Sequence, residues 1–240
     1  MRSPTRLLTA LALLPLLGCA SYTALAPSDR ELLEREFTDR DGTAYLKLSC
    51  YVTPFFGDAS KKLLSPVLPE QSRLLESPAG DPISPGAVEK TIPAGRRARV
   101  LKVEFPTSWA VTERMVYTPR TQPWVFLALE GERNEVPYIL VLRPQLRTPD
   151  EVRQELGRYL SAEDLRPQLD RFTAQVREAV SRKDVVVDMP TEALEMAWGY
   201  PETKTFSFEG QVRKELWKWP GGTRTATVVD GRVAEFTGAR

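Results

Sequence analysis

The side chains that carry most enzyme chemistry are sparse in this chain of 240 residues. It has no histidine and only two cysteines, Cys19 and Cys50. The missing histidine excludes Ser-His-Asp and Cys-His constellations, histidine-ligated zinc and a histidine general base. The 32 acidic residues offer many carboxylate pairs, but none stands out by its spacing. A carboxylate-based enzyme is therefore only a minor alternative.

Signatures of nucleotide, metal and acyl chemistry are also missing from the sequence. The patterns G-x-G-x-x-G, G-x-x-x-x-G-K, G-x-S-x-G and S-x-x-K do not occur. Asp39-Arg40-Asp41-Gly42 imitates the start of a calcium loop, but its glycine comes too early, so we interpret it as a turn. The formal charge of +1 gives no basic field for nucleic acid. We expect a protein that is not an enzyme, with no cofactor, no metal and no nucleic-acid partner.

The N-terminus indicates a cellular address. Arg2 and Arg6 are followed by the apolar run Leu7–Leu17, which is too short to cross a bilayer but has the length typical of a secretory signal. Leu16-Leu17-Gly18-Cys19 comes next and resembles the lipobox of bacterial lipoproteins. The resemblance implies a signal peptide over residues 1–18, a diacylglyceryl group on Cys19 and acylation of the new amino terminus. Such an anchor would be effectively permanent.

The same resemblance indicates where the protein lies. Ala20 and Ser21 follow the cysteine, in place of the aspartate that retains enteric lipoproteins in the inner membrane. We therefore expect an outer-membrane protein that faces the periplasm. Residues 19–42 would form the lipidated tether and a short helix, which a capping-box pattern starts at Ser28 and which ends near Phe37.

With Cys19 lipidated, Cys50 has no cysteine left to pair with. It lies in a strand-like stretch over residues 45–53. We interpret it as a buried structural thiol. A reactive nucleophile is the alternative, although no histidine is present to activate it.

Residues 43–146 are expected to form a small β-rich domain. Its strands are predicted over residues 45–53, 97–105, 111–118, 124–130 and 136–142. Residues 54–93 are rich in proline and predict a long irregular excursion, either functional or loosely ordered. The turn Ile92-Pro93-Ala94-Gly95 before a strand resembles the SH3-like barrels of bacterial envelope proteins, which implies a barrel-like fold.

Residues 147–182 are expected to form a helical connector. Thr148 and Pro149 are typical of a helix start, and this helix should end near Leu160. A second helix is predicted over residues 165–181 because apolar residues recur there at helical spacing. They are Leu165, Leu169, Phe172, Val176 and Val180. We expect this stripe to pack on a sheet, with partner binding as the alternative.

Residues 183–240 predict a short helix ending near Trp198 and strands over residues 203–209, 212–219, 224–229 and 232–237. This part resembles the BamE/SmpA-like envelope lipoprotein domain at Met189, Gly199-Tyr200-Pro201, Trp217-Lys218-Trp219 and Gly231-Arg232-Val233. It departs from the family at Asp188, where a glycine is usual, and at Trp219, where a tyrosine is usual. The resemblance implies helices on a small antiparallel sheet, no catalytic residues, and binding or assistance of other envelope proteins.

Two clusters are candidate contact sites. Trp217 and Trp219 lie two positions apart and would share one face of a strand. Together with Trp198 they are candidate partner-binding residues, with burial in the core as the alternative. The second cluster is basic and would contact lipid phosphates or an acidic partner, unless it is only a solvated strand face. It consists of Arg96, Arg97, Arg99 and Lys102.

These observations together predict an α+β, lipid-anchored outer-membrane lipoprotein. Its predicted role is to bind or scaffold other envelope components without catalysis. The alternative function is a ligand-sensing module, in which the β-rich domain binds a glycan or a lipid beneath the excursion over residues 54–93.

Overall fold

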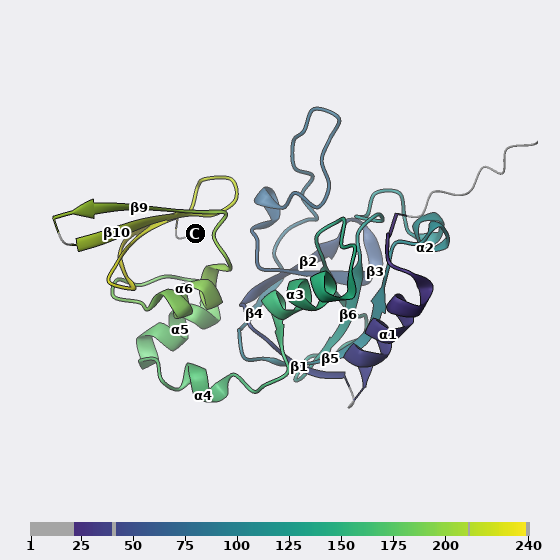
Figure 1. Cartoon of the computed structure of the whole chain (residues 1–240), viewed down its shortest axis with the longest axis horizontal. Coiled ribbons are helices and arrows are strands. Elements are labelled where there is room, and N and C mark those ends of the chain that lie inside the picture. The colour runs from purple at the N-terminus through teal and green to yellow at the C-terminus, as the bar shows by residue number, and fades with distance from the viewer. Residues whose placement is uncertain (1–21, 40–41, 211, 239–240) are drawn as a thin grey trace, which may run out of the picture.

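The computed structural model describes residues 22–39, 42–210 and 212–238. The lipobox with Cys19 and two residues of the predicted turn at residues 39–42 lie outside this part of the chain. The fold is α+β, with an eight-stranded mixed sheet and a four-stranded antiparallel sheet lying side by side (Figure 1). Within the described residues, no helix has the length and apolar character needed to cross a membrane.

The larger sheet is built from the first two thirds of the chain. Its strands are β1 (Thr43–Leu46), β2 (Cys50–Phe55), β3 (Asp58–Ser65), β4 (Lys90–Ile92), β5 (Arg97–Glu104), β6 (Trp124–Leu129), β7 (Tyr138–Val141) and β8 (Leu160–Ser161). They are ordered β4-β2-β3-β7-β6-β5-β1-β8. Neighbouring strands are antiparallel except β3 and β7, which run parallel.

The strand predicted over residues 45–53 is interrupted between β1 and β2. Thr43 faces Arg99 on β5. Val52 lies nine residues after Thr43 and faces Lys90 on β4, which lies nine residues before Arg99. The register is therefore the same on both sides of the interruption. The ladder breaks at Ser49 because its backbone N–H donates to Met196 O and its hydroxyl to Val180 O, both in the C-terminal part.

The partner of this interruption is the predicted turn over residues 92–95. Arg96 N donates to Pro93 O at 3.3 Å, and Gly95 N donates to Leu46 O at 2.7 Å. Gly95 has a φ of +79°, and a Cβ there would lie 2.5 Å from Leu169 Cδ1. The positive φ favours glycine, and a larger residue would also have to displace the end of the Leu169 side chain.

Two predictions for the β-rich part are wrong. Residues 54–93 are not one irregular excursion, because they contain β3, β4 and the short helix η2 (Pro69–Gln71). Residues 111–118 do not form a strand. Residues 111–113 instead belong to the helix α2 (Ser108–Glu113). This helix starts after Thr107, whose hydroxyl accepts a hydrogen bond from Ala110 N.

Helices α1 (Pro27–Thr38) and α3 (Pro149–Tyr159) pack on the larger sheet and contribute Leu33, Val152 and Leu156 to its core. The capping box of α3 is present, with Thr148 and Glu151 bonded to each other's backbone N–H groups. The predicted capping box at Ser28 is wrong. Helix α1 starts one residue earlier, and its N-cap is Ala26, which has no side-chain hydrogen bond.

The smaller sheet confirms the strands predicted near the C-terminus. It contains β9 (Thr203–Glu209), β10 (Val212–Lys218), β11 (Thr225–Val229) and β12 (Arg232–Thr237), in the order β12-β11-β10-β9. Preceding it are α4 (Arg166–Leu169), α5 (Ala174–Arg182) and α6 (Thr191–Trp198). The helix predicted over residues 165–181 is thus two helices, because Thr173 caps a new one. Its apolar stripe nevertheless lies in the C-terminal core.

Residues 147–182 do not form a separate helical connector, because their helices belong to two different cores. Helix α3 belongs to the core of the larger sheet, whereas α5 belongs to the core beneath the smaller sheet. The two parts of the molecule meet along Ser49 and along Arg224, whose Nη2 donates to Tyr51 Oη at 2.8 Å.

Candidate functional site

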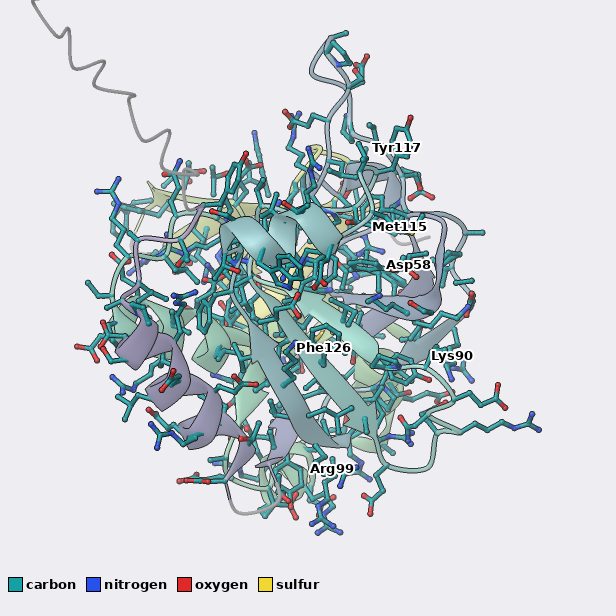
Figure 2. All side chains as sticks on the ribbon, turned by 90° about the vertical axis from the view of Figure 1, so that its right-hand side faces the viewer. Asp58, Lys90, Arg99, Met115, Tyr117 and Phe126 are labelled. Atoms are coloured by element: carbon teal, nitrogen blue, oxygen red, sulfur yellow. The ribbon has the colours of Figure 1, made fainter. Side chains whose placement is uncertain are left out.

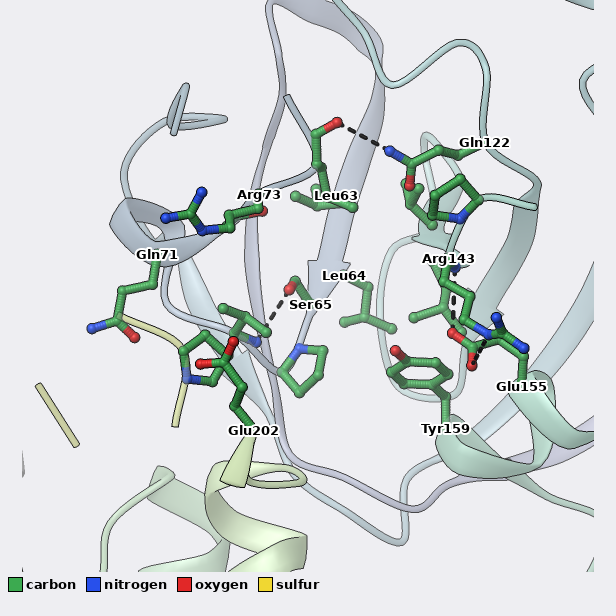
Figure 3. A pocket seen from close by; sticks show the side chains of 18 of the residues that line it. Leu63, Leu64, Ser65, Gln71, Arg73, Gln122, Arg143, Glu155, Tyr159 and Glu202 are labelled. Atoms are coloured by element: carbon green, nitrogen blue, oxygen red, sulfur yellow. Dashed lines mark hydrogen bonds and ion pairs between the residues drawn. The ribbon is translucent and has the colours of Figure 1, made fainter. Parts of the chain in front are cut away.

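A groove of about 500 Å³ lies between the larger sheet, the loop that follows β3 and the C-terminal part. Its floor is formed by the carboxyl-terminal ends of the parallel pair β3 and β7, through Leu63, Leu64, Ser65 and Val141. In Figure 3 these β3 side chains lie in the middle of the groove. The volume is in the range typical of small-molecule and cofactor sites.

Charged and polar side chains surround this apolar floor. Gln71 and Arg73 stand on one side, and Arg143, Glu155 and Tyr159 on the other (Figure 3). Glu202 lies at the end near the smaller sheet. Two arginines and two glutamates thus line the groove, so it carries no net charge for attracting a strongly charged ligand.

Gln122 is buried, yet half of its amide is unsatisfied. Its Nε2 donates to Leu74 O at 3.1 Å, which fixes the orientation of the amide. Its Oε1 is buried and has no hydrogen-bond partner among the described residues. A buried acceptor without a donor is costly, so a turn of the side chain that brings Oε1 to a ligand N–H or O–H would be favoured.

The opposite wall is held rigidly by Glu155, whose side chain is only 3% exposed. Glu155 Oε1 accepts a hydrogen bond from Arg143 N at 3.3 Å, and Oε2 lies 3.4 Å from Arg143 Nε and 3.6 Å from Arg158 Nη1. Burial, and secondarily Glu155, raises the pKa of Tyr159 to about 12. The phenol of Tyr159 therefore stays protonated and offers this wall a hydroxyl group.

The groove continues into a second cavity of about 220 Å³ toward the smaller sheet. The two cavities share six lining residues, among them Val67, Gln71 and Tyr159. Gln71 Nε2 donates to Thr223 Oγ1, which ties the loop after β3 to the smaller sheet. The whole is an elongated channel with walls from both parts of the molecule.

The three tryptophans expected to bind a partner are not at the surface. Trp198, Trp217 and Trp219 are 2–3% exposed and pack together beneath the smaller sheet, with the Trp198 and Trp219 rings 5.0 Å apart. Trp217 and Trp219 do lie on the inward side, but α5 and α6 cover it. Their expected role as surface anchors is therefore wrong, and the alternative of core packing is confirmed.

The basic cluster lies partly on one face of β5. A β-bulge between Val100 and Lys102 shifts the alternation, so Arg97, Arg99 and Lys102 are all exposed. Arg96 donates to Glu130 O at 2.8 Å, Arg97 lies 3.8 Å from Glu130, and Lys102 lies 2.6 Å from Glu104. Much of the cluster's charge is thus matched by neighbouring acceptors, which weakens the expectation of a dedicated anion site.

Cys50 is a buried free thiol, as expected, and burial raises its pKa to about 12. Near it lie two buried cations that carry no recognisable signal in the sequence, Lys183 and Arg224. Lys183 Nζ donates to Ser49 O at 2.6 Å and to Ala197 O at 2.7 Å, and lies 4.8 Å from the Tyr51 ring centroid. Neither cation has a carboxylate partner among the described residues.

No family model matches the chain, and comparison with curated proteins and with solved structures gives no match. Within the described residues, no group of three or more histidine, cysteine or acidic side chains is placed to hold a metal ion.

Proposed function

We propose that this protein is a lipid-anchored lipoprotein of the outer membrane that faces the periplasm and binds another envelope protein without catalysis. The bound element is an extended segment of that partner, held in the groove between the two sheets. The protein acts without nucleic acid, metal or cofactor, apart from the covalent lipid on Cys19.

The groove itself carries this proposal. Its length, its apolar floor and the equal numbers of arginines and glutamates around its larger cavity suit a peptide with alternating apolar and polar side chains. Gln122 lines the groove, and its buried Oε1 would gain a partner if the side chain turned to meet a backbone N–H of the bound segment. Main-chain hydrogen bonds supply affinity and alternate side-chain pockets supply specificity in this kind of recognition.

The finer fold assignments belong to the same proposal. We infer a barrel-like, SH3-like unit for residues 43–146, supported by the unbroken register of β1–β2 against β4–β5. We infer a BamE/SmpA-like unit for residues 183–240, supported by the order of β9 to β12 and by the helices against their inner face.

The second candidate is the ligand-sensing module. It is favoured by one observation, that residues 66–67 and 71–74 from the proline-rich stretch form a wall of the groove. The occupant would then be a glycan or a lipid. Among the described residues, Tyr159 is the one aromatic side chain lining the larger cavity, whereas the smaller cavity adds Tyr200, so a sugar would stack toward the smaller sheet.

The test is photo-crosslinking of the full-length protein in its native envelope. A photoreactive residue replaces Arg73 on the groove rim or, as the matched control, exposed Arg171. We expect a protein adduct from position 73 and none from position 171. Val67→Trp, which fills the groove, should abolish it, whereas Val187→Trp on the exposed surface should not. An adduct of glycan or lipid mass supports the second candidate, and no adduct contradicts groove binding.

The anchor is tested separately by mass spectrometry of the mature N-terminal peptide. Acyl chains on Cys19 are expected, together with the loss of residues 1–18. An unmodified Cys19 would contradict the lipoprotein assignment without bearing on the groove.

A further inference from the structure

Helix α2 and the segment after it expose an apolar surface that the groove does not use. Within nine residues, four large apolar side chains are exposed by 48–77%. They are Trp109, Met115, Val116 and Tyr117, which we call the α2 surface. Single exposed apolar residues are ordinary, but a local group of this size marks an interaction surface.

The α2 surface is held in place by Arg114, whose side chain is 3% exposed. Its guanidinium pairs with Glu104 at 2.7 Å, donates to Arg120 O and Gln122 O at 2.7 Å, and lies 3.8 Å from the Trp124 ring centroid. These contacts of Arg114 fix the backbone of the segment, so its exposed apolar side chains are held in place.

The position of the α2 surface identifies what it contacts. Pro27 of α1 and Trp109 of α2 line the same cleft. Figure 1 shows α2 beside the point where the described chain starts, at Tyr22, which is itself 53% exposed. Cys19 lies three residues before Tyr22, and three extended residues reach at most about 10 Å. A lipid on Cys19 would thus place a membrane next to this end of the molecule.

We propose that the α2 surface inserts into the membrane interface beside the anchor, so that it fixes the orientation of the protein on the lipid. The inference rests on the proposed lipidation of Cys19. Tryptophan and tyrosine, with apolar rings and polar tips, favour this boundary. The groove between the sheets would then be held at a set angle to the membrane.

Apolar insertion, and not attraction to anionic lipid, accounts for the contact. Four glutamates and two basic residues line the cleft beside Trp109. They are Glu31, Glu34, Glu104 and Glu113, with Arg30 and Lys102. Arg99 of the basic cluster lies at the opposite end of the molecule from Met115 and Tyr117 (Figure 2). The contact should therefore form on zwitterionic lipid and resist salt.

Tryptophan quenching tests the orientation. The full-length lipidated protein is placed in phosphatidylcholine vesicles with brominated acyl chains. Four of the five tryptophans are 2–3% exposed, so quenching should report Trp109 alone. We expect quenching that disappears in Trp109→Phe and falls at least twofold in Met115→Ser/Tyr117→Ser. The control Phe206→Ser/Phe208→Ser, equally exposed on β9, should leave it unchanged.

Vesicle flotation in the same samples separates the two proposals. Flotation without quenching overturns the α2 surface while the anchor stands. Quenching that requires phosphatidylglycerol or is lost in high salt overturns apolar insertion. Failure to float overturns the anchor and, with it, this inference.

Discussion

The free energy of unfolding should rise with pH above pH 7, and replacing Lys183 by methionine should abolish this rise. Lys183 lies at the C-terminus of α5 and is 3% exposed. Its hydrogen bonds within the described part of the chain go to the carbonyls of Ser49 and Ala197. Burial, and secondarily Arg224, lowers the pKa of Lys183 to about 7, although Cys50 acts in the opposite direction. The folded chain therefore releases this proton at a pH where the unfolded chain keeps it.

The magnitude follows from the difference between the folded pKa and the ordinary value of 10.5. Between these two values the unfolded state binds one more proton, so the free energy of unfolding rises with pH by at most about 1.4 kcal/mol per unit. Below pH 7 both states are protonated and the gain is absent. From pH 7 to pH 8, where the folded amine is still completing its titration, the rise is about 1 kcal/mol.

Urea unfolding at pH 7 and pH 8, followed by tryptophan fluorescence, measures this rise. The interval from pH 7 to pH 8 isolates the titration of Lys183, because the chain has no histidine and the Cys50 thiol titrates above pH 8 in both states. Lys183→Met also loses two hydrogen bonds, but that loss does not depend on pH. Lys183→Arg keeps a charge that cannot be released, so it should be less stable and equally flat with pH.

The reasoning is refuted if the wild-type protein and Lys183→Met show the same change in unfolding free energy between the two pH values. A wild-type protein that loses stability over this interval would also contradict it, because the sign of the linkage would then be reversed.

Two further predictions concern buried groups. Arg114→Met should lower the free energy of unfolding by about 3 kcal/mol, because the carbonyls of Arg120 and Gln122 lose their donor and Glu104 keeps only Lys102 as an ionic partner. Arg114→Met/Glu104→Gln should recover part of the loss in the same urea assay. An unchanged urea midpoint would show that the contacts of Arg114 contribute nothing to stability. Cys50 should resist a thiol reagent at pH 8 until the chain unfolds, since burial raises its pKa to about 12; rapid labelling of the native protein, followed by mass spectrometry, would contradict its burial.

The elements that the sequence predicted well are those whose ends are marked locally. Glycine and proline separate the four strands of the smaller sheet, and Thr148 with Glu151 sets the start of α3. At such positions the backbone conformation depends on the residue itself and its near neighbours. Contacts with distant parts of the chain therefore altered the ends of these elements little.

The elements that were mispredicted depend on distant contacts. Val116 and Tyr117 are good strand formers by type, but Arg114 ties this segment to Glu104 and keeps it out of the ladder. The pairing of β1 and β2 is interrupted because Ser49 bonds to Met196 and Val180. Neither contact has a signature in the residues around it.

The groove could not be predicted from the sequence either, because it too is formed by residues that lie far apart along the chain. Its walls come from residues as far apart as Leu63 and Gly221, and no spacing along the chain links them. The tryptophan pair shows the intermediate case. Alternation correctly put Trp217 and Trp219 on one side of the sheet, but it does not tell which side the helices cover.

The strand order has a consequence for how the chain reaches its fold. In the smaller sheet every strand pairs with its neighbour along the chain, so it can assemble hairpin by hairpin. In the larger sheet β3 must find β7, and β1 must find β8 more than a hundred residues later. Pairings at such separations close slowly, because the entropy of a long loop is lost before any contact compensates for it. Completion of the larger sheet should therefore limit the folding rate of the whole chain.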